Sequence, residues 1–331
     1  MTIVAQAPNP KCPLCESKRT QPRAGYQHLT PAEWSLCQCS ECGTSFLDPI
    51  PDTEILATYY DQDYYGRGAG KFLGPVEVIV RIFRYLRARA IQHLMPRGRV
   101  LDVGCGRGVM LKYLKSWGFG VDGVELDTVA AARARHNLRQ EIFHTLEEPA
   151  QSLPQQYQAI CFWHSLEHLP EPGKTLRTAD RLLAPGGVLV ISAPHMESLQ
   201  SRLSRRSWLH LDLPRHLVHF DMNGLARFLQ ANGYRLIRHQ HFSQEYNVID
   251  TLCYLYAVLG FNHLYPFELL RGMHRHRDCI KNVIRHVFGL SLLLVLVTAA
   301  FGVANSSSLL KSGSSVTLFL RKQNGPVSPH H

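Results

Sequence analysis

The stretch RVLDVGCGRG at residues 99–108 constrains the fold of this chain more than any other. Its VLDV run has the apolar character of a buried parallel strand, and a helical pattern, MLKYLKSWG, begins directly after the glycines. Three glycines at alternate positions allow the backbone to approach a ligand at the end of that strand. These are Gly104, Gly106 and Gly108. The order of strand, glycine turn and helix predicts the mononucleotide-binding unit of an open α/β sheet.

The next segments continue this pattern. GVDGVELD at 120–127 is predicted to be a second strand that ends in Glu125, about twenty residues after the loop, where a carboxylate can accept both ribose hydroxyls of a nucleoside. QAICFWHSLEHLPEP at 158–172 predicts a third strand that ends in a polar cluster. LLAPGGVLVISAPH at 182–195 predicts a helix end, a Gly-Gly turn and a further strand. The glycine spacing is GxGxG, which differs from the GxGxxG of a dinucleotide site.

In this order, the blocks VLDVGCGRG, GVELD, LEHLPEP and LLAPGGVLVISAPH resemble those of class I S-adenosylmethionine (SAM)-dependent methyltransferases. One subgroup is similar beyond these blocks. It has a Cys-rich N-terminal segment, a Tyr-rich segment (here 59–65) and a W…LDLPRHLVHF block, here Trp208 to Phe220. The resemblance covers residues 12–242 and the final strand. It implies an α/β fold with a Rossmann-like seven-stranded methyltransferase sheet whose last strand is antiparallel.

The resemblance also assigns a SAM site. Asp102 and the glycine loop would form the floor under the methionine moiety, and Glu125 would hold the ribose, with Leu126 beside the adenine. The implied cofactor-binding residues are Tyr60, Asp102, Gly104, Cys105, Gly106, Gly108, Glu125, Leu126, Trp163 and His164. The Tyr-rich group could cover this pocket or pack between the Cys-rich segment and the main domain, and both interpretations stay open.

Methyl transfer requires an aligned acceptor and often a base that removes its proton. Histidines follow several predicted strands at the edge where an open α/β sheet places its ligands, and their pKa lies near neutrality. The candidate bases are His164, His168, His195, His216 and His219. For any one of them, ordinary packing is the simpler interpretation.

The HSLEH cluster has a second interpretation. Some quinone-biosynthesis O-methyltransferases carry E-x-x-E-H here and bind a divalent metal through those side chains. In this chain Glu167 and His168 match, but His164 replaces the first Glu. A general-base His is therefore the preferred account, and Glu167 is expected to brace the following helix.

Two CxxC pairs near the N-terminus predict a structural zinc site. The pairs are Cys12/Cys15 and Cys39/Cys42, separated by 23 residues, and two such turns can present four thiolates to one tetrahedral ion. Cys37 lies close enough to the second pair to replace Cys39. Four protein ligands leave no open position for water, so this zinc would stabilise the segment without catalysing.

An uncharged run of eighteen residues, VFGLSLLLVLVTAAFGVA at 287–304, raises the question of a membrane span. Predicted strands at 234–242 and 314–322 flank it. Because both belong to one sheet in the methyltransferase fold, a single crossing is excluded. A two-pass hairpin with the apolar stretch 248–267 would carry the basic connector 271–286 across the bilayer, against the positive-inside tendency. The remaining alternatives are a lid, a dimer interface or shallow insertion into an anionic leaflet.

The predicted organisation has four parts. They are a zinc-binding segment at 1–55, a linker and helical cap at 56–98, a SAM-binding core at 99–242 with 314–322, and an apolar helical insertion at 243–313. The net charge of +10 suggests anionic ligands or an anionic membrane surface as partners. The sequence shows no obvious basic run of the kind that binds nucleic acids. The N-terminus, MTIVAQAPNPKC, lacks the pattern of a signal peptide, which predicts a cytoplasmic protein, either free or peripheral at the inner face of the membrane.

The acceptor is not encoded in these motifs. The subgroup often sits among genes for surface polysaccharides and glycolipids, so a sugar, lipid-linked sugar or related metabolite is the leading expectation. An isoprenoid-quinone O-methyltransferase and a non-catalytic SAM- or partner-binding protein are the alternatives.

Overall fold

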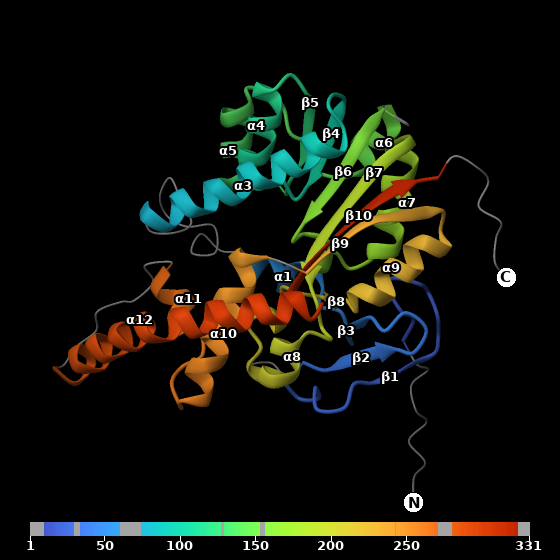
Figure 1. Cartoon of the computed structure of the whole chain (residues 1–331). Helices are drawn as coiled ribbons and strands as arrows, with labels where there is room; N and C mark the ends of the chain where they lie inside the picture. Colours follow the sequence, from blue (N-terminus) through green and yellow to red (C-terminus); the bar gives the residue numbers. More distant parts are fainter. Residues whose placement is uncertain are drawn as a thin grey trace, which may run out of the picture.

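A mixed β-sheet of six strands forms the centre of the protein (Figure 1). The computed structural model describes residues 10–29, 34–59, 74–126, 129–152, 156–241, 243–270 and 280–323. The strands lie in the order β5-β4-β6-β7-β10-β9. Their bounds are β4 Arg99–Val103, β5 Gly120–Val124, β6 Tyr157–Trp163, β7 Leu183–Pro194, β9 Tyr234–Gln240 and β10 Ser315–Lys322. The first four are parallel, and β10 is antiparallel to both of its neighbours, as expected from the sequence.

The place of the expected seventh strand is taken by a single parallel bridge between Val124 and Phe143. Phe143 donates its N–H to Gly123 and accepts one from Glu125. The next two N–H groups, those of His144 and Thr145, turn away to the Glu148 carboxylate. The Thr145 N–H is the next one that would face β5 in a longer parallel ladder, and it is donated to this carboxylate instead. In the described part of the chain the sheet therefore has six strands.

The predicted Gly-Gly turn is part of a strand. β7 runs through Gly186 and Gly187, and its pairing with β6 shifts register between Tyr157 and Ala159. Gly186 has a φ of +70°, which an L side chain rarely adopts, so the glycines accommodate an irregularity inside a continuous strand.

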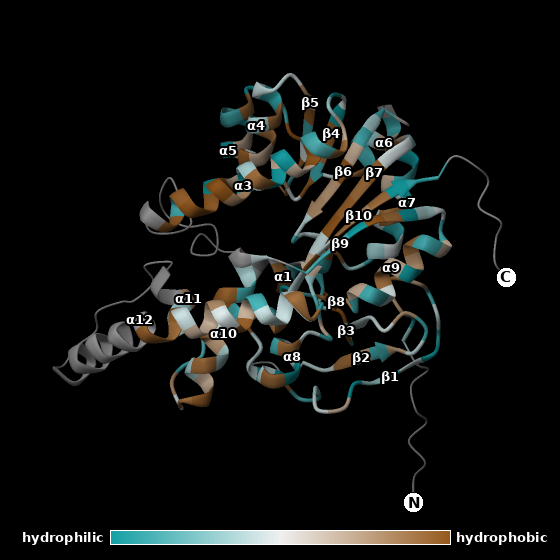
Figure 2. Cartoon of the chain, viewed as in Figure 1, coloured by the Kyte–Doolittle hydropathy of each residue, from teal (hydrophilic) through white to brown (hydrophobic). Residues whose placement is uncertain are grey.

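Helices cover both faces of the sheet. Successive residues of a strand point to opposite faces, so Val100 and Leu101 of β4 belong to two different cores. Helices α3 (Gly74–Leu94), α4 (Val109–Ser116) and α5 (Val129–Leu138) pack on the face of Val100. On the face of Leu101 lie α7 (Pro172–Leu182) and α9 (Met222–Ala231), with α6 (Glu147–Ser152) beside α7. Figure 2 shows hydrophobic residues concentrated in the central strands.

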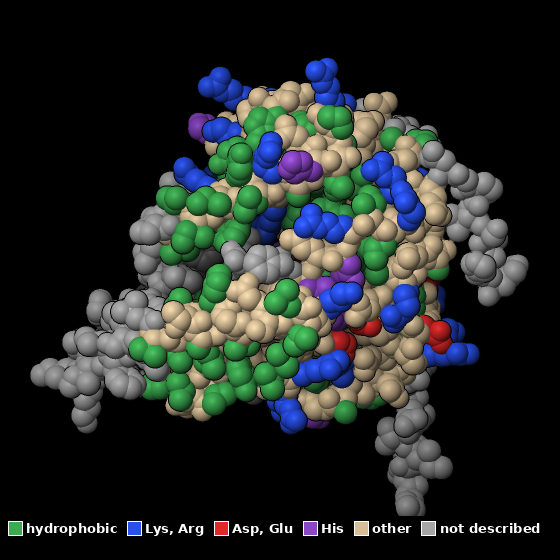
Figure 3. Space-filling model, in the orientation of Figure 1, with side chains coloured by type: hydrophobic (Ala, Val, Ile, Leu, Met, Phe, Trp, Pro, Cys, Tyr) green, Lys and Arg blue, Asp and Glu red, His purple; other side chains and the backbone are tan. Residues whose placement is uncertain are grey.

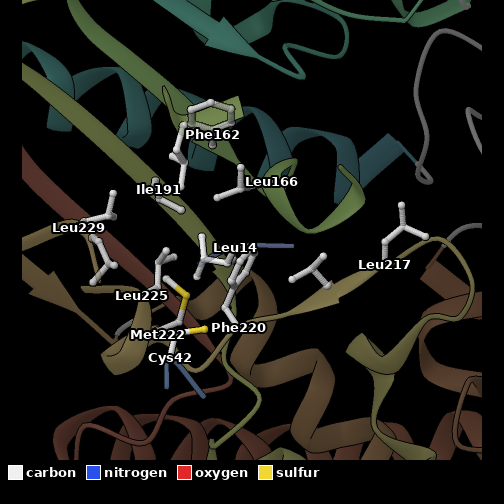
Figure 4. Close-up of a cluster of buried hydrophobic side chains, with 14 of the residues drawn as sticks. Leu14, Cys42, Phe162, Leu166, Ile191, Leu217, Phe220, Met222, Leu225 and Leu229 are labelled. Carbon is white, nitrogen blue, oxygen red and sulfur yellow. The ribbon is translucent and has the colours of Figure 1, made fainter. Parts of the chain in front are cut away.

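The N-terminal segment shares the second of these cores. Strands β1 (Thr20–Pro22), β2 (Leu36–Cys39) and β3 (Ser45–Leu47) form an antiparallel sheet that β8 (Val218–His219) completes, and α1 (Thr53–Thr58) follows. Leu14 and Cys42 pack among Phe220, Met222 and Leu225 (Figure 4). Each fully buried apolar side chain of this kind contributes about 1.5–3 kcal/mol. The segment is thus attached to the main domain by a continuous apolar core.

Short helices connect the strands around the site. They are η1 (Leu166–His168) after β6, and α8 (Leu199–Ser204), η2 (Arg205–Ser207) and η3 (Leu209–Leu211) between β7 and β8.

Three helices form the insertion between β9 and β10: α10 (Gln244–Val258), α11 (Tyr265–Leu270) and α12 (Ile280–Leu309). Helix α12 packs against α10, and its buried residues in the described part are Ala300, Ala304 and Ser307, with the partly buried Leu296 beside them. Large apolar side chains such as Phe301 and Leu309 are exposed.

Among the described residues, no helix has both the length and the apolar character needed to span a bilayer. The basic connector predicted at 271–286 and the first part of the apolar run, 287–294, fall outside the described side chains.

Candidate functional site

The glycine loop after β4 is bonded to the end of the neighbouring strand. The N–H groups of Gly104 and Cys105 both donate to the carbonyl of Val124, and Gly104 has a φ of +78°. A Cβ atom on Gly104 would lie 2.5 Å from Cβ of Ser165, so packing requires glycine there. Gly106 is different, because a Cβ added to it would meet nothing within 4 Å. The loop thus packs against the protein at Gly104 and leaves open space at Gly106, where a ligand can bind.

Glu125 binds the open part of this loop. Its Oε2 accepts a hydrogen bond of 2.7 Å from the N–H of Gly106, and its Oε1 accepts one of 3.1 Å from Leu126. Burial raises the pKa of Glu125 above its ordinary value. Each carboxylate oxygen has further acceptor capacity. The carboxylate can therefore hold the loop and still accept ribose hydroxyls. The Leu126 side chain is exposed.

Asp102, at the floor of the pocket, is buried and lacks a hydrogen-bond donor to Oδ1 among the described residues. Burial raises its pKa to about 7, and the nearby Arg87 and Arg84 of α3 oppose this shift. A buried carboxylate oxygen without a donor suits a cationic ligand group. The ammonium group of the SAM methionine moiety has this character. The donor set and the open cradle at Gly106 thus fit SAM.

Other predicted cofactor residues surround this floor. Trp163 packs edge-on against Phe319, and the Arg87 guanidinium lies 4.9 Å above its ring. Burial raises the pKa of the Cys105 thiol well above its ordinary value, so this side chain is part of the packing. An ion pair between Arg107 and Glu77 of α3 links the loop to the helix that covers it. Tyr60, with the rest of the Tyr-rich group after Tyr59, lies outside the described residues.

His164 follows β6 directly, in a left-handed conformation with φ +55°. Its Nε2 lies 3.1 Å from Ser315 Oγ and 3.3 Å from Ser192 Oγ, while its Nδ1 lies 3.4 Å from Glu167 Oε1. Burial lowers the pKa of His164 well below its ordinary value. The imidazole is therefore neutral at pH 7 and keeps a lone pair for a proton. The ring of Tyr246, from α10 of the insertion, lies against it with centroids 3.9 Å apart.

Two more of the predicted histidines meet beside Glu167. The rings of His168 and His216 have centroids 4.7 Å apart, and their ligand atoms and that of Glu167 all lie within 4.8 Å of one another. Glu167 is 1% exposed, and neither carboxylate oxygen has a hydrogen-bond partner in the described part of the chain. Burial raises its pKa to about 8.

The structure places the remaining two candidate bases differently. His219 lies beside His216, but its Nε2 is bonded to the carbonyl oxygen of Leu211 at 3.0 Å. His195, at the end of β7, accepts the N–H of Met222 at Nδ1 and lies next to His241, just before the insertion. Both side chains are buried and bonded to the main chain, which suits a role in positioning loops.

Sequence reasoning missed several neighbours of His164. His210 packs between the Tyr246 ring, at 5.6 Å, and the His216 ring, at 6.4 Å. His210 stands inside the Trp208–Phe220 block, so that block carried a usable signal. Tyr246 carries none, because only the folding of the insertion brings it to β6.

The four cysteines of the CxxC pairs come together. Sγ of Cys12 lies 3.6 Å from that of Cys42, and Sγ of Cys15 lies 3.6 Å from that of Cys39. Four sulfurs at 2.3 Å from a tetrahedral zinc would lie about 3.8 Å apart, so the donor set and spacing fit the ion. Cys37, the alternative ligand, points instead to Asp48 Oδ2 at 3.7 Å.

Comparison with known proteins gives the family. Residues 78–239 match the family model described as "Methyltransferase domain". Residues 78–239 form a class I SAM-dependent methyltransferase domain. This domain contains the glycine loop, Glu125 and the His164 cluster described above.

Curated relatives match the methyltransferase domain in part. The "Ubiquinone biosynthesis O-methyltransferase" of Pseudomonas aeruginosa (strain LESB58) is 32% identical over 100 residues, which are 28% of this chain and 43% of that protein. The protein of the same name from Aeromonas salmonicida (strain A449) is 35% identical over 100 residues, covering 28% and 42%. The chain thus spans less than half the length of these relatives.

Solved structures that are similar to this chain include a putative sarcosine dimethylglycine methyltransferase from Galdieria sulphuraria. It is 16% identical, with a TM-score of 0.47 over 81% of this chain and 98% of that chain. A SAM-dependent methyltransferase from Archaeoglobus fulgidus is 19% identical, with a TM-score of 0.44 over 72% and 94%.

Proposed function

We propose that this protein transfers the methyl group of SAM to a small molecule that binds beside His164. The observation that carries the proposal is the position of the partly exposed His164 imidazole at the end of β6, the strand next to the glycine loop strand β4. At this edge of an open α/β sheet, a ligand on the glycine loop and a second ligand at β6 are neighbours.

The residues of the site have distinct roles in this reaction. Bound SAM supplies an electrophilic methyl group. Asp102 and the glycine loop hold its methionine moiety, and Glu125 its ribose. His164 accepts the proton that the acceptor loses, at Nε2, with the hydroxyls of Ser192 and Ser315 placed to relay it. Oε1 of Glu167 lies 3.4 Å from Nδ1 on the other side of the ring.

The surroundings of His164 support a hydroxyl-bearing acceptor. His210, Tyr246 and Ser315 offer hydrogen-bonding groups close to the base. A sugar, a lipid-linked sugar or a related metabolite has the matching hydroxyls. The names of the curated relatives support the alternative of an isoprenoid quinone, and a non-catalytic SAM-binding protein is the third candidate.

We assign the insertion 243–313 to the wall of the acceptor pocket, because α10 delivers Tyr246 to His164. Its outer surface supports a further role. In α12 the fully buried residues Ala300, Ala304 and Ser307 are small, and Val295, Phe301 and Leu309 are exposed, which resembles helix pairs packed in lipid. Val78, Ile82 and Leu86 of α3 are also exposed, and Figure 3 shows hydrophobic side chains gathered over α3 and over α10 and α12.

This surface and the net charge of +10 favour peripheral contact with an anionic membrane, at the cytoplasmic face, over a homodimer. A lipid-linked acceptor would suit that location. We further propose that the four-Cys cluster holds one structural zinc, and we expect no nucleic-acid partner.

The decisive experiment measures SAM binding by calorimetry and then release of S-adenosylhomocysteine with pools of nucleotide sugars, lipid-linked sugars, quinols and lipid extracts. Turnover with a sugar or lipid-linked pool supports the proposal, and turnover only with quinols supports the alternative. In His164→Asn, turnover should fall about 10²–10⁴-fold while SAM affinity is retained. SAM binding without turnover on any pool would identify a non-catalytic protein.

A further inference from the structure

The turn that follows α12 exposes two leucines beside a lysine. Leu309 and Leu310 are 85% and 77% exposed, the highest values among the large apolar side chains in the described part of the chain. We propose that this turn, residues 309–311, is a binding site for the phosphate headgroup of an anionic lipid. The inference rests on the membrane contact proposed above, and it assigns a headgroup site to particular residues.

The main chain fixes the direction of this turn. The N–H groups of Lys311 and Ser312 donate to carbonyls of α12, and the Ser312 carbonyl accepts the N–H of Leu199 in α8. A Cβ atom on Gly313 would lie 2.2 Å from the carbonyl oxygen of His241, so the backbone after the turn packs tightly against the end of β9. Because both sides of the turn are held, the exposure of its two leucines is a property of the fold.

Cations lie beside the two leucines. Lys311 is exposed, and it has a φ of +54°, in the left-handed region. Arg202 follows Leu199 by three residues, so both lie on the same side of α8, and the Arg202 side chain is 67% exposed. Glu197 is paired with both Arg202 and Arg23, at 3.6 and 2.7 Å, which leaves the three cations in excess. Exposed leucines flanked by cations are typical of a segment that enters the headgroup region of an anionic leaflet.

The turn also continues a larger apolar surface. Phe301 and Val303 of α12 and Leu203 of α8 are exposed. Figure 3 shows Lys and Arg side chains along the border of the hydrophobic surface over α10 and α12. A lipid leaflet matches such a surface, because its phosphates and its acyl chains lie in successive layers. A symmetric contact with a second copy of the chain would instead bring the cations of both copies together.

Two histidines lie next to the turn. The rings of His239 and His241 have centroids 4.3 Å apart. Nε2 of His239 and Nδ1 of His241 are buried and lack hydrogen-bond partners among the described residues. Burial lowers the pKa of His239 below its ordinary value and that of His241 to about 4, and the charge of Lys311 acts in the same direction on both. Both rings are therefore neutral at pH 7.

Lipid binding should be coupled to protonation of this pair. The groups that face it from other elements are Lys311, His195, Asp221 and, through His195, Glu197. Lys311 opposes protonation of both rings, whereas Asp221 favours that of His239. A lipid phosphate at Lys311 would offset the opposing charge, so lipid binding and proton uptake by His239 favour each other. Affinity for anionic vesicles should rise as the pH falls through the range in which histidine titrates.

Sedimentation of the full-length protein with vesicles tests the site. Vesicles of phosphatidylcholine mixed with phosphatidylglycerol are compared with vesicles of phosphatidylcholine alone. Leu310→Ser and Lys311→Asn should each weaken binding to the mixed vesicles about threefold to tenfold. Asn tolerates the positive φ at position 311, so this change removes the charge and keeps the turn. Lys174→Ser, at an exposed lysine of α7, removes the same charge elsewhere and should bind as the wild type does.

A pH series gives a second measurement. Between about pH 7.5 and about pH 5.5, the affinity of the wild type for the mixed vesicles should rise more than that of His239→Asn. His136→Asn, at an exposed histidine of α5, should keep the full rise. An equal rise in the wild type and in His239→Asn would overturn the coupling to His239.

Unchanged binding in both Leu310→Ser and Lys311→Asn would overturn the headgroup site. If Phe301→Ser then weakens binding, the membrane contact proposed above holds without this site. Wild-type protein that binds neither kind of vesicle contradicts both. A wild-type dimer in analytical ultracentrifugation that Leu310→Ser abolishes would identify a second copy as the occupant and refute the lipid site. These measurements do not involve methyl transfer, so failure of the proposed enzymatic activity leaves them unaffected.

Discussion

The indole Nε1 of Trp208 donates a 2.9 Å hydrogen bond to Oδ2 of Asp250, and both side chains are buried. Trp208 begins the block that ends at Phe220, and Asp250 lies in α10 of the insertion. This bond joins the methyltransferase domain to the helix that carries Tyr246. Helix α10 is therefore anchored to the Trp208–Phe220 block.

Asp250 should make stability pH-dependent. Burial raises its pKa from 3.8 to about 7 in the folded protein. Because the pKa is raised on folding, the protonated side chain contributes fully to stability below pH 3.8, the pKa of the unfolded state. This contribution, up to about 4 kcal/mol of unfolding free energy, is lost as the pH rises through 7, the pKa of the folded state. In the wild type, the free energy of unfolding measured with urea should fall between pH 4 and 8. In Asp250→Asn it should fall less, because the contribution of Asp250 is absent. In the control Glu141→Gln, which changes an exposed carboxylate, the free energy of unfolding should fall with pH as it does in the wild type. An unchanged decline in Asp250→Asn would refute the assignment.

The zinc proposal distinguishes two neighbouring cysteines. Cys39→Ser should release the metal and lower the unfolding temperature, because the four sulfurs act as one closed site. Cys37→Ser is the matched control, since Cys37 points to Asp48, and it should keep the metal. Elemental analysis of the purified variants checks both. Wild-type protein without sulfur-bound zinc would contradict the assignment.

Cofactor binding should depend on Glu125. Glu125→Ala removes the acceptor for Gly106 and for the ribose, and should weaken SAM binding by roughly 2–3 kcal/mol in calorimetry. Gly106→Val should abolish binding, because its side chain fills the open cradle. Circular dichroism confirms folding, and undiminished SAM affinity in both Glu125→Ala and Gly106→Val would exclude this pocket.

Asn247 should hold the insertion in place. It donates to the His241 carbonyl and to Ser308 Oγ, and its Oδ1 accepts from Ser314 and Ser315. Asn247→Ala leaves these buried groups without partners and should cost about 2–4 kcal/mol. Hydrogen exchange should rise in α10 and α12 more than in the central sheet. Asn305→Ala, at a side chain bonded only to the Phe301 carbonyl of its own helix, is the control and should show no such rise.

Membrane contact is predicted to be peripheral. Because β9 and β10 belong to one sheet, both ends of the insertion return to the same domain. High-salt and carbonate washes should therefore release the protein from membranes. Phe301→Ser, at an exposed position, should reduce binding to anionic vesicles, and Val78→Ser tests the α3 surface in the same way. Protein that leaves the pellet only with detergent would show a spanning segment.

The sequence alone determined the features that depend on local pattern. The apolar runs identified β4, β5 and β6 because a buried parallel strand needs nearly every residue apolar. The glycine loop was recognisable because a positive φ, as at Gly104, strongly favours glycine. The spacing of the CxxC pairs predicted the sulfur cluster, although it left Cys37 and Cys39 as alternatives.

Tertiary structure decided which distant residues meet. Local spacing carries no information about contacts between separate segments, so His216 beside Glu167, and Tyr246 against His164, appeared only after folding. The same holds for Cys37 and Cys39: Sγ of Cys39 lies 3.6 Å from that of Cys15, whereas Sγ of Cys37 lies 3.7 Å from Oδ2 of Asp48. It also holds for the seventh strand, which the described part of the chain does not contain. There, the Glu148 carboxylate accepts the N–H of Thr145, which a longer pairing with β5 would have used.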